Sequence, residues 1–450
     1  MRKYQNKLLE YLFYLFVFLL PWQTVFLLRE IFIGGEKWQY GTIGIYGIDF
    51  LMLLFLILSS VNYLRDLNFQ FPISNFQSIF NVLISKFRNS DLTQNSKFKI
   101  KNYGLLIASG GLIILSFLSI VWSFDKLLAF YFSSKLFLAA SLFWSVLRIK
   151  FDWKKLIFIL ILGASLQSIL AIGQFLTQQD FANAILGTSH HEVFAGGTSV
   201  VENQSGRWLR AYGSFPHPNM LGGYLAIILL LGIFFWLKYT HENKTQFFLL
   251  ITLSIIFSGL VLSFSRSAWL IFTIGLFFIF IFQKEKRKEL WKIAIIFLLT
   301  LLIWTSAFSS LFFSRFSGED RLEQKSISDR TEYVQQTKEI IKDNFWLGAG
   351  AGNYTKEVFQ KNPQKSIWQI QPVHNVFLLI WSELGIIGLL IFIAIIIFTL
   401  FSLKNNPVLF LLLTSYFLLL FFDHWLWTTH FGILLFFLAM GMIIKEALNS

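Results

Sequence analysis

The sequence predicts an all-α fold: one polytopic membrane bundle over residues 1–450, with about twelve transmembrane helices and a helical extracytoplasmic loop domain. Of the 450 residues, 55% are hydrophobic and only 14% are charged, and the mean hydropathy is +0.61. A soluble chain of this length needs more polar surface than that. The apolar residues also come in blocks of about twenty, the length that a helix needs to cross a hydrocarbon core of about 30 Å.

The apolar blocks define the expected membrane spans, and aromatic residues such as Trp122 and Trp236 lie near their ends, where they anchor helices at the interface. The first block has no small-residue cleavage site after it, so we expect it to be retained rather than removed as a signal peptide. The expected spans are 8–28, 43–64, 104–124, 127–147, 155–177, 218–237, 246–264, 268–283, 291–312, 374–401, 407–422 and 430–445.

The distribution of basic residues predicts that both termini are cytoplasmic. In that orientation most of the 38 Lys and Arg residues fall in cytoplasmic segments, as the positive-inside rule requires. The same bias explains the net charge of +13, so we expect membrane lipids and no nucleic acid as partners. The cytoplasmic loop 65–103 is polar, and we expect it to be irregular.

Two extracytoplasmic segments, 178–217 and 313–373, are long enough to fold. The second contains an amphipathic helix, which we expect to start at Asp329 with Glu332 completing a capping box. It should end before the glycine-rich run 348–353, which we interpret as a turn because it lacks the Lys-Ser/Thr pair of a phosphate-binding loop.

The chain has no cysteine, which excludes disulfides and thiolate metal sites. Adjacent His190 and His191 point apart and have no further ligand at metal-binding spacing, so we expect no metal. Lys135 falls inside the fourth span and requires a partner such as Asp49 or Asp125.

Arginines at the outer rim are candidates for anion binding. Arg266 lies between two apolar spans, where an arginine costs roughly 2.5–3.5 kcal/mol near the membrane centre and less at its edge. It either binds an anion such as phosphate, or reaches lipid headgroups, or pairs with Glu383 or Asp423. Arg210, just before the sixth span, either binds a ligand or meets lipid phosphate.

Two histidines lie at the starts of spans. His374 is a candidate general base, because the unperturbed imidazole is largely neutral at pH 7, or else an interfacial hydrogen-bonding residue. For the run of His217, Pro218 and Asn219 we favour a capping role, with Asn219 and the fixed φ of Pro218 starting a helix.

In their order and spacing, these clusters resemble the O-antigen ligase and polymerase family of polytopic glycosyltransferases. The likeness covers about residues 205–390. The matching stretches are Arg210 with residues 213–219, residues 262–269, Asp329 and Arg330 with residues 344–353, and His374 and Asn375 with residues 383–388. The chain departs from the family at Asn344-Phe345-Trp346, where a proline usually precedes the leucine-glycine pair, which affects only the local loop shape.

The resemblance implies an inverting transfer of a glycan from undecaprenyl diphosphate to an acceptor hydroxyl, without metal, nucleotide or other cofactor, at the outer face of the bacterial inner membrane. Arg210 and Arg266 would bind the diphosphate and His374 would take the acceptor proton. Arg330 matches a basic position of the family's extracytoplasmic helix, whereas His217, Asn219, Asn375 and Glu383 are structural or further site residues.

The acceptor is a lipid, a glycan or a protein. We favour a ligase; a repeat-unit polymerase and a protein O-oligosaccharyltransferase are alternatives within the family. A transporter or flippase of lipid-linked sugars is the alternative from another class. It fits less well, because transport sites favour the bilayer midplane and the sequence shows no internal repeat.

Overall fold

The computed structural model describes residues 2–33, 35–66, 96–203, 206–239, 243–317 and 321–449. The long helices are α1 (Arg2–Leu19), α2 (Gly47–Asp66), α4 (Ser96–Leu118), α5 (Lys126–Arg148), α6 (Trp153–Thr177), α7 (Pro218–Tyr239), α8 (Asn243–Leu262), α9 (Arg266–Phe282), α10 (Arg287–Ala307), α14 (Val376–Ser402), α15 (Pro407–Phe422) and α17 (His430–Asn449). The shorter helices are α11 (Ser309–Ser317), α12 (Arg321–Asp343), α13 (Tyr354–Lys361) and α16 (Trp425–Thr428), with 3₁₀ turns η1 (Gln39–Gly41), η3 (Ser119–Val121), η4 (Lys284–Lys286) and η5 (Ile367–Gln369). The strands are β1 (Val25–Arg29), β2 (Phe32–Ile33), β3 (Glu36–Lys37), β4 (Ile43–Tyr46), β5 (Val200–Asn203) and β6 (Gly206–Leu209).

The predicted fold class, an all-α polytopic membrane bundle, is confirmed. Within the described residues, seven helices are long and apolar enough to cross a membrane, and four further apolar helices are shorter. The most apolar stretch of α7 is buried along its whole length, whereas only 17% of the corresponding stretch of α10 is buried. Central helices therefore pack against protein on all sides, while peripheral helices turn apolar residues such as Ile303 outward, as lipid contact requires.

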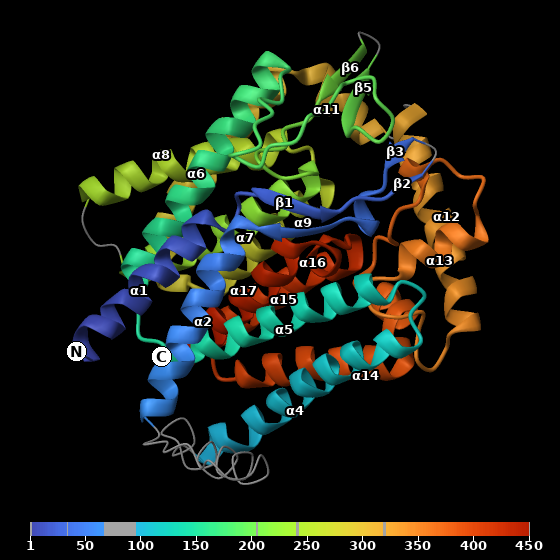
Figure 1. The fold of residues 1–450 in the computed structure, drawn as a ribbon. Helices are drawn as coiled ribbons and strands as arrows, with labels where there is room; N and C mark the ends of the chain where they lie inside the picture. The colour runs from blue at the N-terminus through green and yellow to red at the C-terminus, as the bar shows by residue number, and fades with distance from the viewer. Residues whose placement is uncertain are drawn as a thin grey trace.

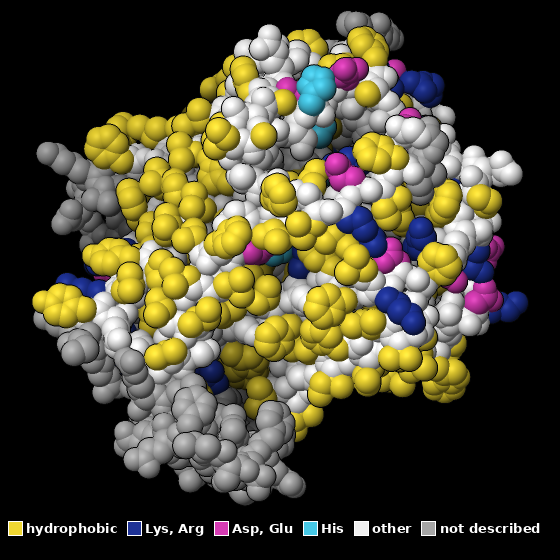
Figure 2. Space-filling model, in the orientation of Figure 1, with side chains coloured by type: hydrophobic (Ala, Val, Ile, Leu, Met, Phe, Trp, Pro, Cys, Tyr) yellow, Lys and Arg dark blue, Asp and Glu magenta, His cyan; other side chains and the backbone are white. Residues whose placement is uncertain are grey.

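The two ends of the bundle differ. Figure 1 shows both termini at one end, and α12, α13 and the β5–β6 hairpin at the other. In Figure 2, apolar side chains cover much of the visible side of the bundle, and charged side chains gather over α12 and α13. We call the end that carries α12 and α13 the loop end.

The first predicted span is wrong in its second half. α1 ends at Leu19, and residues 25–46 form two short antiparallel pairs, β1 with β4 and β2 with β3. Pro21 lacks the amide hydrogen that continues a helix. Further along, Arg29 pairs with Asp125 at 2.6 Å, which holds the hairpin against the start of α5.

The predicted amphipathic helix exists, but it begins earlier than expected. α12 starts at Arg321, so Asp329 lies inside the helix and is not its cap. Its apolar side is buried as predicted at Tyr333 and Ile340, and the Thr337 hydroxyl lies 2.8 Å from the Tyr354 hydroxyl of α13. The loop predicted over 65–103 lies mostly outside the described residues, and its last part is already helical because α4 begins at Ser96.

The glycine-rich run is a turn, and it joins a break in α14. Gly385 has a left-handed φ of 67° within α14. Across the break, the amide of Gly350 donates to the Glu383 carbonyl (2.8 Å) and the amide of Ile386 donates to the Phe345 carbonyl (2.9 Å). A Cβ at position 385 would lie 2.0 Å from the Trp346 carbonyl oxygen, so this seam requires glycine.

Candidate functional site

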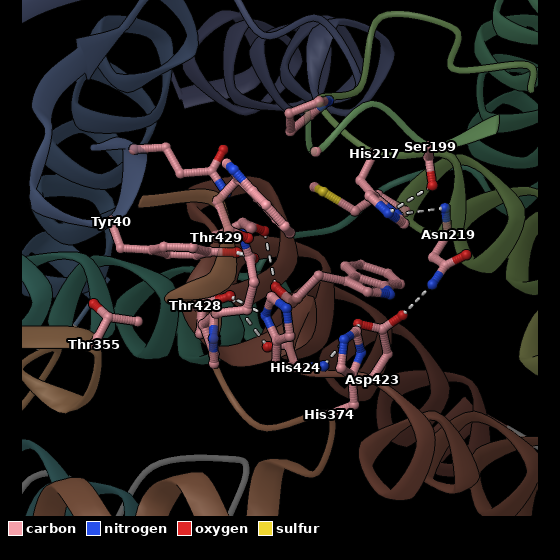
Figure 3. Close-up of a pocket in the computed structure, with 18 of the residues that line it drawn as sticks. Tyr40, Ser199, His217, Asn219, Thr355, His374, Asp423, His424, Thr428 and Thr429 are labelled. Carbon is pink, nitrogen blue, oxygen red and sulfur yellow. Dashed lines mark hydrogen bonds and ion pairs between the residues drawn. The ribbon is translucent and has the colours of Figure 1, made fainter. Parts of the chain in front are cut away.

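A cavity of about 900 Å³ lies among the β1–β4 hairpin, the segment before α7, α12, the start of α14 and the α15–α17 connection. Its lining includes six of the predicted residues: Arg210, His217, Asn219, Arg330, His374 and Glu383. Arg266 and Asn375 are not among the lining residues. Figure 3 shows how His217 and Asn219 lie on one side of the His374–Asp423 pair, with Tyr40 and Thr429 on the other.

Three arginines, Arg210, Arg315 and Arg330, form what we call the arginine pocket. Arg210 is 4% exposed. Its guanidinium donates to the Ser263 carbonyl (2.8 Å), to the Ser199 hydroxyl (3.0 Å) and to the Asn219 amide oxygen (2.8 Å). Every one of these acceptors is neutral, so they orient the guanidinium without cancelling its charge.

The charges in the arginine pocket oppose one another. Burial lowers the pKa of Arg210 below its ordinary value; the charges of Arg266 and Arg330 act in the same direction, and Tyr212 and Asp423 oppose them. Burial and the same two arginines also lower the pKa of Arg315, whose Nε donates to the Phe264 carbonyl at 3.2 Å. Arginine still holds its proton at neutral pH, so the pocket concentrates positive charge that an anion would stabilise.

Arg266 is the first residue of α9 and lies beside the arginine pocket. Its charge lowers the pKa of Arg210 and of Arg315, although Arg266 does not line the cavity itself. Arg315 belongs to α11 and was not singled out from the sequence, because it follows directly on an apolar block and carries no motif.

His374 lies immediately before α14, with Nδ1 3.5 Å from Asp423 Oδ1. Asn375 is the N-cap of α14 and accepts from the Leu378 amide (3.0 Å), so its side chain fixes the start of the helix. His374 is 23% exposed on its side chain, whereas Asp423 is 5% exposed. The histidine thus lies in the cavity wall beside a buried carboxylate, with its ring packed near those of Tyr333 and His424.

Asp423 was expected from the sequence only as a possible partner of Arg266, and the site predictions did not include it. Burial alone would raise the pKa of its carboxyl, but the interaction with neighbouring His374 holds that pKa well below its usual range. The group is therefore a carboxylate at neutral pH. The available signal was an acidic residue between two apolar spans, the same pattern that drew attention to Arg266.

Asn219 links the arginine pocket to Asp423. Its Nδ2 donates to Asp423 Oδ2 at 2.8 Å while its Oδ1 accepts from Arg210. α7 begins at Pro218, as predicted, but His217 and not Asn219 provides the cap, because His217 Nδ1 accepts from the Asn219 amide at 3.1 Å. Burial and Arg210 lower the pKa of His217 to about 3, so the ring is neutral and its Nε2 faces Ser199 (3.1 Å).

Glu383 lines the cavity from α14 and is 2% exposed. Its side chain accepts from Trp427 Nε1 at 2.9 Å, and its backbone carbonyl accepts from the Gly350 amide at 2.8 Å. These bonds tie α14 to the glycine-rich turn and to α16. Glu383 therefore shapes the wall of the cavity.

One set of side chains could hold a divalent cation. His374, Asp423 and His424 offer ligand atoms that lie within 4.8 Å of one another. However, His424 Nδ1 pairs with the Thr428 hydroxyl at 2.8 Å, and Asp423 already accepts from Asn219 and from the His424 amide. A metal would have to replace these bonds, and the absence of a metal from the reaction stays a prediction.

Part of the chain is similar to a known protein family. Residues 251–393 match the family model described as O-Antigen ligase. The matched stretch runs from α8 into α14 and includes Arg266, Arg315, Arg330, His374 and Glu383. No curated protein matches the chain.

Proposed function

We propose that this chain, a multi-pass membrane protein of the O-antigen ligase family by its match over residues 251–393, moves a glycan from a polyprenyl diphosphate to an acceptor hydroxyl. The expected donor lipid is undecaprenyl diphosphate. Transfer takes place at the loop end of the bundle, which faces away from the cytoplasm. The reaction inverts the anomeric centre and uses no metal.

The observation that carries the proposal is that one cavity contains both the arginine pocket and a histidine–carboxylate pair. Diphosphate carries several negative charges, and guanidinium groups bind phosphate oxygens through paired donors. Positively charged groups fixed in advance around a leaving group stabilise the charge that grows on it in the transition state. The mutual repulsion of Arg210 and Arg315 with their neighbours is relieved when such an anion binds.

His374 is the proposed general base. Its Nδ1 lies 3.5 Å from Asp423 Oδ1, and a proton held on Nδ1 beside this carboxylate leaves the Nε2 lone pair for the acceptor hydroxyl. As the acceptor oxygen bonds to the anomeric carbon, its proton passes to His374 and the bond from that carbon to the diphosphate oxygen breaks. The electron pair leaves with the diphosphate, and Asp423 stabilises the imidazolium that forms.

The other predicted residues support these two groups. Asn219 and His217 orient Arg210, directly and through Ser199. Arg330 reaches the cavity from α12, while Arg266 strengthens the positive potential from beside it. The basic cytoplasmic loops predicted from the sequence place both termini inside, in agreement with their position opposite the loop end in Figure 1.

The test is transfer of a radiolabelled glycan from a polyprenyl diphosphate in proteoliposomes that contain the purified protein. We expect product with the diphosphate donor and none with the matching monophosphate, which lacks the good leaving group. A protein that moves the labelled lipid across the bilayer but never cleaves it would overturn the proposal in favour of a flippase.

A further inference from the structure

The cavity continues past His374 to a second end, away from the arginine pocket. Tyr46, Tyr131, Lys135 and His430 line this end, and we call it the lysine chamber. In Figure 3, Thr428 and Thr429 lie on the opposite side of His424 from Ser199 and Asn219, and Thr429 leads directly into His430 of the chamber. The histidine–carboxylate pair therefore has the arginine pocket on one side and the single ammonium group of Lys135 on the other.

Lys135 forms no direct ion pair with either carboxylate that the sequence offered as a partner, although the charge of Asp49 acts on it. Asp125 pairs with Arg29 at 2.6 Å, and Asp49 Oδ1 lies 2.7 Å from His430 Nε2. Over the described part of the chain, no carboxylate lies within ion-pair distance of Lys135 Nζ. Its close contacts are π faces, with Nζ 3.8 Å from the ring centre of Tyr131 and 5.4 Å from that of Tyr46.

The rings of the lysine chamber are held in place. The Tyr131 hydroxyl donates to the Gly44 carbonyl at 2.5 Å and accepts from the Gly44 amide at 3.2 Å. Tyr46 stacks on His430 with ring centres 4.3 Å apart. His430 is 2% exposed, and its Nδ1 is buried without a hydrogen-bond partner. The chamber thus offers fixed aromatic walls, an ammonium group with donors to spare and an unsatisfied imidazole nitrogen.

We propose that the lysine chamber is the acceptor subsite and that it binds a sugar carrying an anionic group, a carboxylate or a phosphate. Aromatic faces pack against the apolar C–H faces of a pyranose, and the ammonium group forms charge-assisted hydrogen bonds with its anion. The proposal rests on the proposed function, because an in-line displacement needs the acceptor opposite the leaving group, and the base lies between the chamber and the arginine pocket. Of the lipid, glycan and protein acceptors, it selects an acidic glycan.

The first test measures binding without any donor, so its outcome does not depend on catalysis. Glucose, glucuronic acid and glucose 6-phosphate are titrated against the full chain in nanodiscs by saturation-transfer NMR, with inorganic pyrophosphate present to occupy the arginine pocket. We expect both acidic sugars to bind at least about tenfold more tightly than glucose, the effect of one charge-assisted hydrogen bond. Lys135→Gln should reduce this preference to less than about twofold and leave glucose binding unchanged.

Two control variants locate the anion. Lys126→Gln removes an exposed lysine from the same helix, α5, outside the cavity and should keep the preference. Arg330→Gln removes a cation of the arginine pocket and should also keep it. A preference that survives in Lys135→Gln, or one that disappears in Arg330→Gln, would overturn the proposal.

A second measurement uses only the wild-type protein, in case Lys135→Gln does not fold. A small amine-acetylating reagent is applied with and without each sugar, and modification of Lys135 is read by peptide mass spectrometry. Glucuronic acid should protect Lys135 and leave Lys126 reactive, whereas glucose should protect neither. Equal modification with both sugars would overturn the proposal, and so would a Lys135 that the reagent never reaches, because such a chamber is closed to a sugar. If the sugars behave as expected but no glycan is transferred from any diphosphate donor, the proposed function fails and the sugar site stands.

Discussion

The two ends of the cavity hold positive charge in different ways. In the arginine pocket, Arg210 is fixed by neutral acceptors and its charge adds to those of Arg315 and Arg330. In the lysine chamber a single ammonium rests on aromatic rings while the nearby carboxylate, Asp49, faces a histidine. Several convergent guanidinium groups match a multiply charged diphosphate, whereas one ammonium among rings matches a sugar with one acidic group. Under our proposals, this difference means that the donor and the acceptor bind on opposite sides of His374.

The largest effect should come from the residue between the two ends. His374→Gln keeps a polar side chain of similar size but removes the base, so we expect transfer to fall about 10²–10⁴-fold in kcat. Initial rates in proteoliposomes, with folding checked by thermal melting, measure this. The neighbouring His424→Gln serves as control and should lose far less, because His424 already pairs with Thr428. Unchanged turnover in the His374 variant would remove the base from the mechanism.

Next should come the arginine pocket. Arg210→Lys preserves one charge but loses the fork of donors that contacts Ser263, Ser199 and Asn219, and we expect kcat/KM for the donor to fall about 10²-fold. The KM for the acceptor should not change, and this separates the two ends of the cavity. An equal loss for both substrates would show that the two ends do not act independently.

Asp423→Asn tests the carboxylate that lies between Asn219 and His374, and its effects on stability and turnover are measured as a function of pH. The pKa of Asp423 is depressed, so its contribution to stability is present above the unfolded value of about 3.9 and is lost only as pH falls through the lower folded value. The melting temperatures of wild type and variant should therefore differ by a constant amount between pH 5 and 8. The loss of the carboxylate also removes the group that stabilises the imidazolium formed during transfer, so kcat should fall at every pH in this range. An unchanged kcat would leave Asp423 with a purely structural role.

The smallest effect should come from chelation. Treatment with EDTA should leave turnover within about twofold of the untreated enzyme, because the ligand atoms of Asp423 and His424 are engaged within the protein. Readdition of zinc, manganese or magnesium controls for metal stripped from elsewhere. A rate that collapses with EDTA and returns with one cation would turn His374, Asp423 and His424 into a metal site and reassign the centre of the cavity.

Much of the bundle could be predicted because its helices follow from the lengths of the apolar blocks. Expected spans such as 155–177 and 407–422 lie within two residues of α6 and α15. The β1–β4 hairpin was missed because its apolar residues directly extend the first block, and hydropathy alone does not register the break that Pro21 causes. α12 starts earlier than predicted because eight helical residues precede the capping pattern at Asp329.

The site was predictable where several residues share a motif and not where a contact joins distant parts of the chain. Arg210, Arg330 and His374 each stand in a short polar stretch next to an apolar one, and all three line the cavity. Asp423 is far along the chain from His374, and nothing in the local sequence indicates their contact. The sequence identified Asp49 as a charge near Lys135. It did not indicate that Asp49 pairs with His430, because that contact depends on how α2 and α17 pack.

The break in α14 at Gly385 also has a consequence for the architecture of the cavity. The backbone hydrogen bonds across this break join the turn at 345–350, which follows α12, to the first part of α14, which follows His374. Arg330 on α12 and His374 before α14 thus belong to two segments that are joined by backbone hydrogen bonds at the α14 break, away from either side chain. A substitution at this break would therefore move Arg330 of the arginine pocket away from His374, the proposed base, without changing either residue.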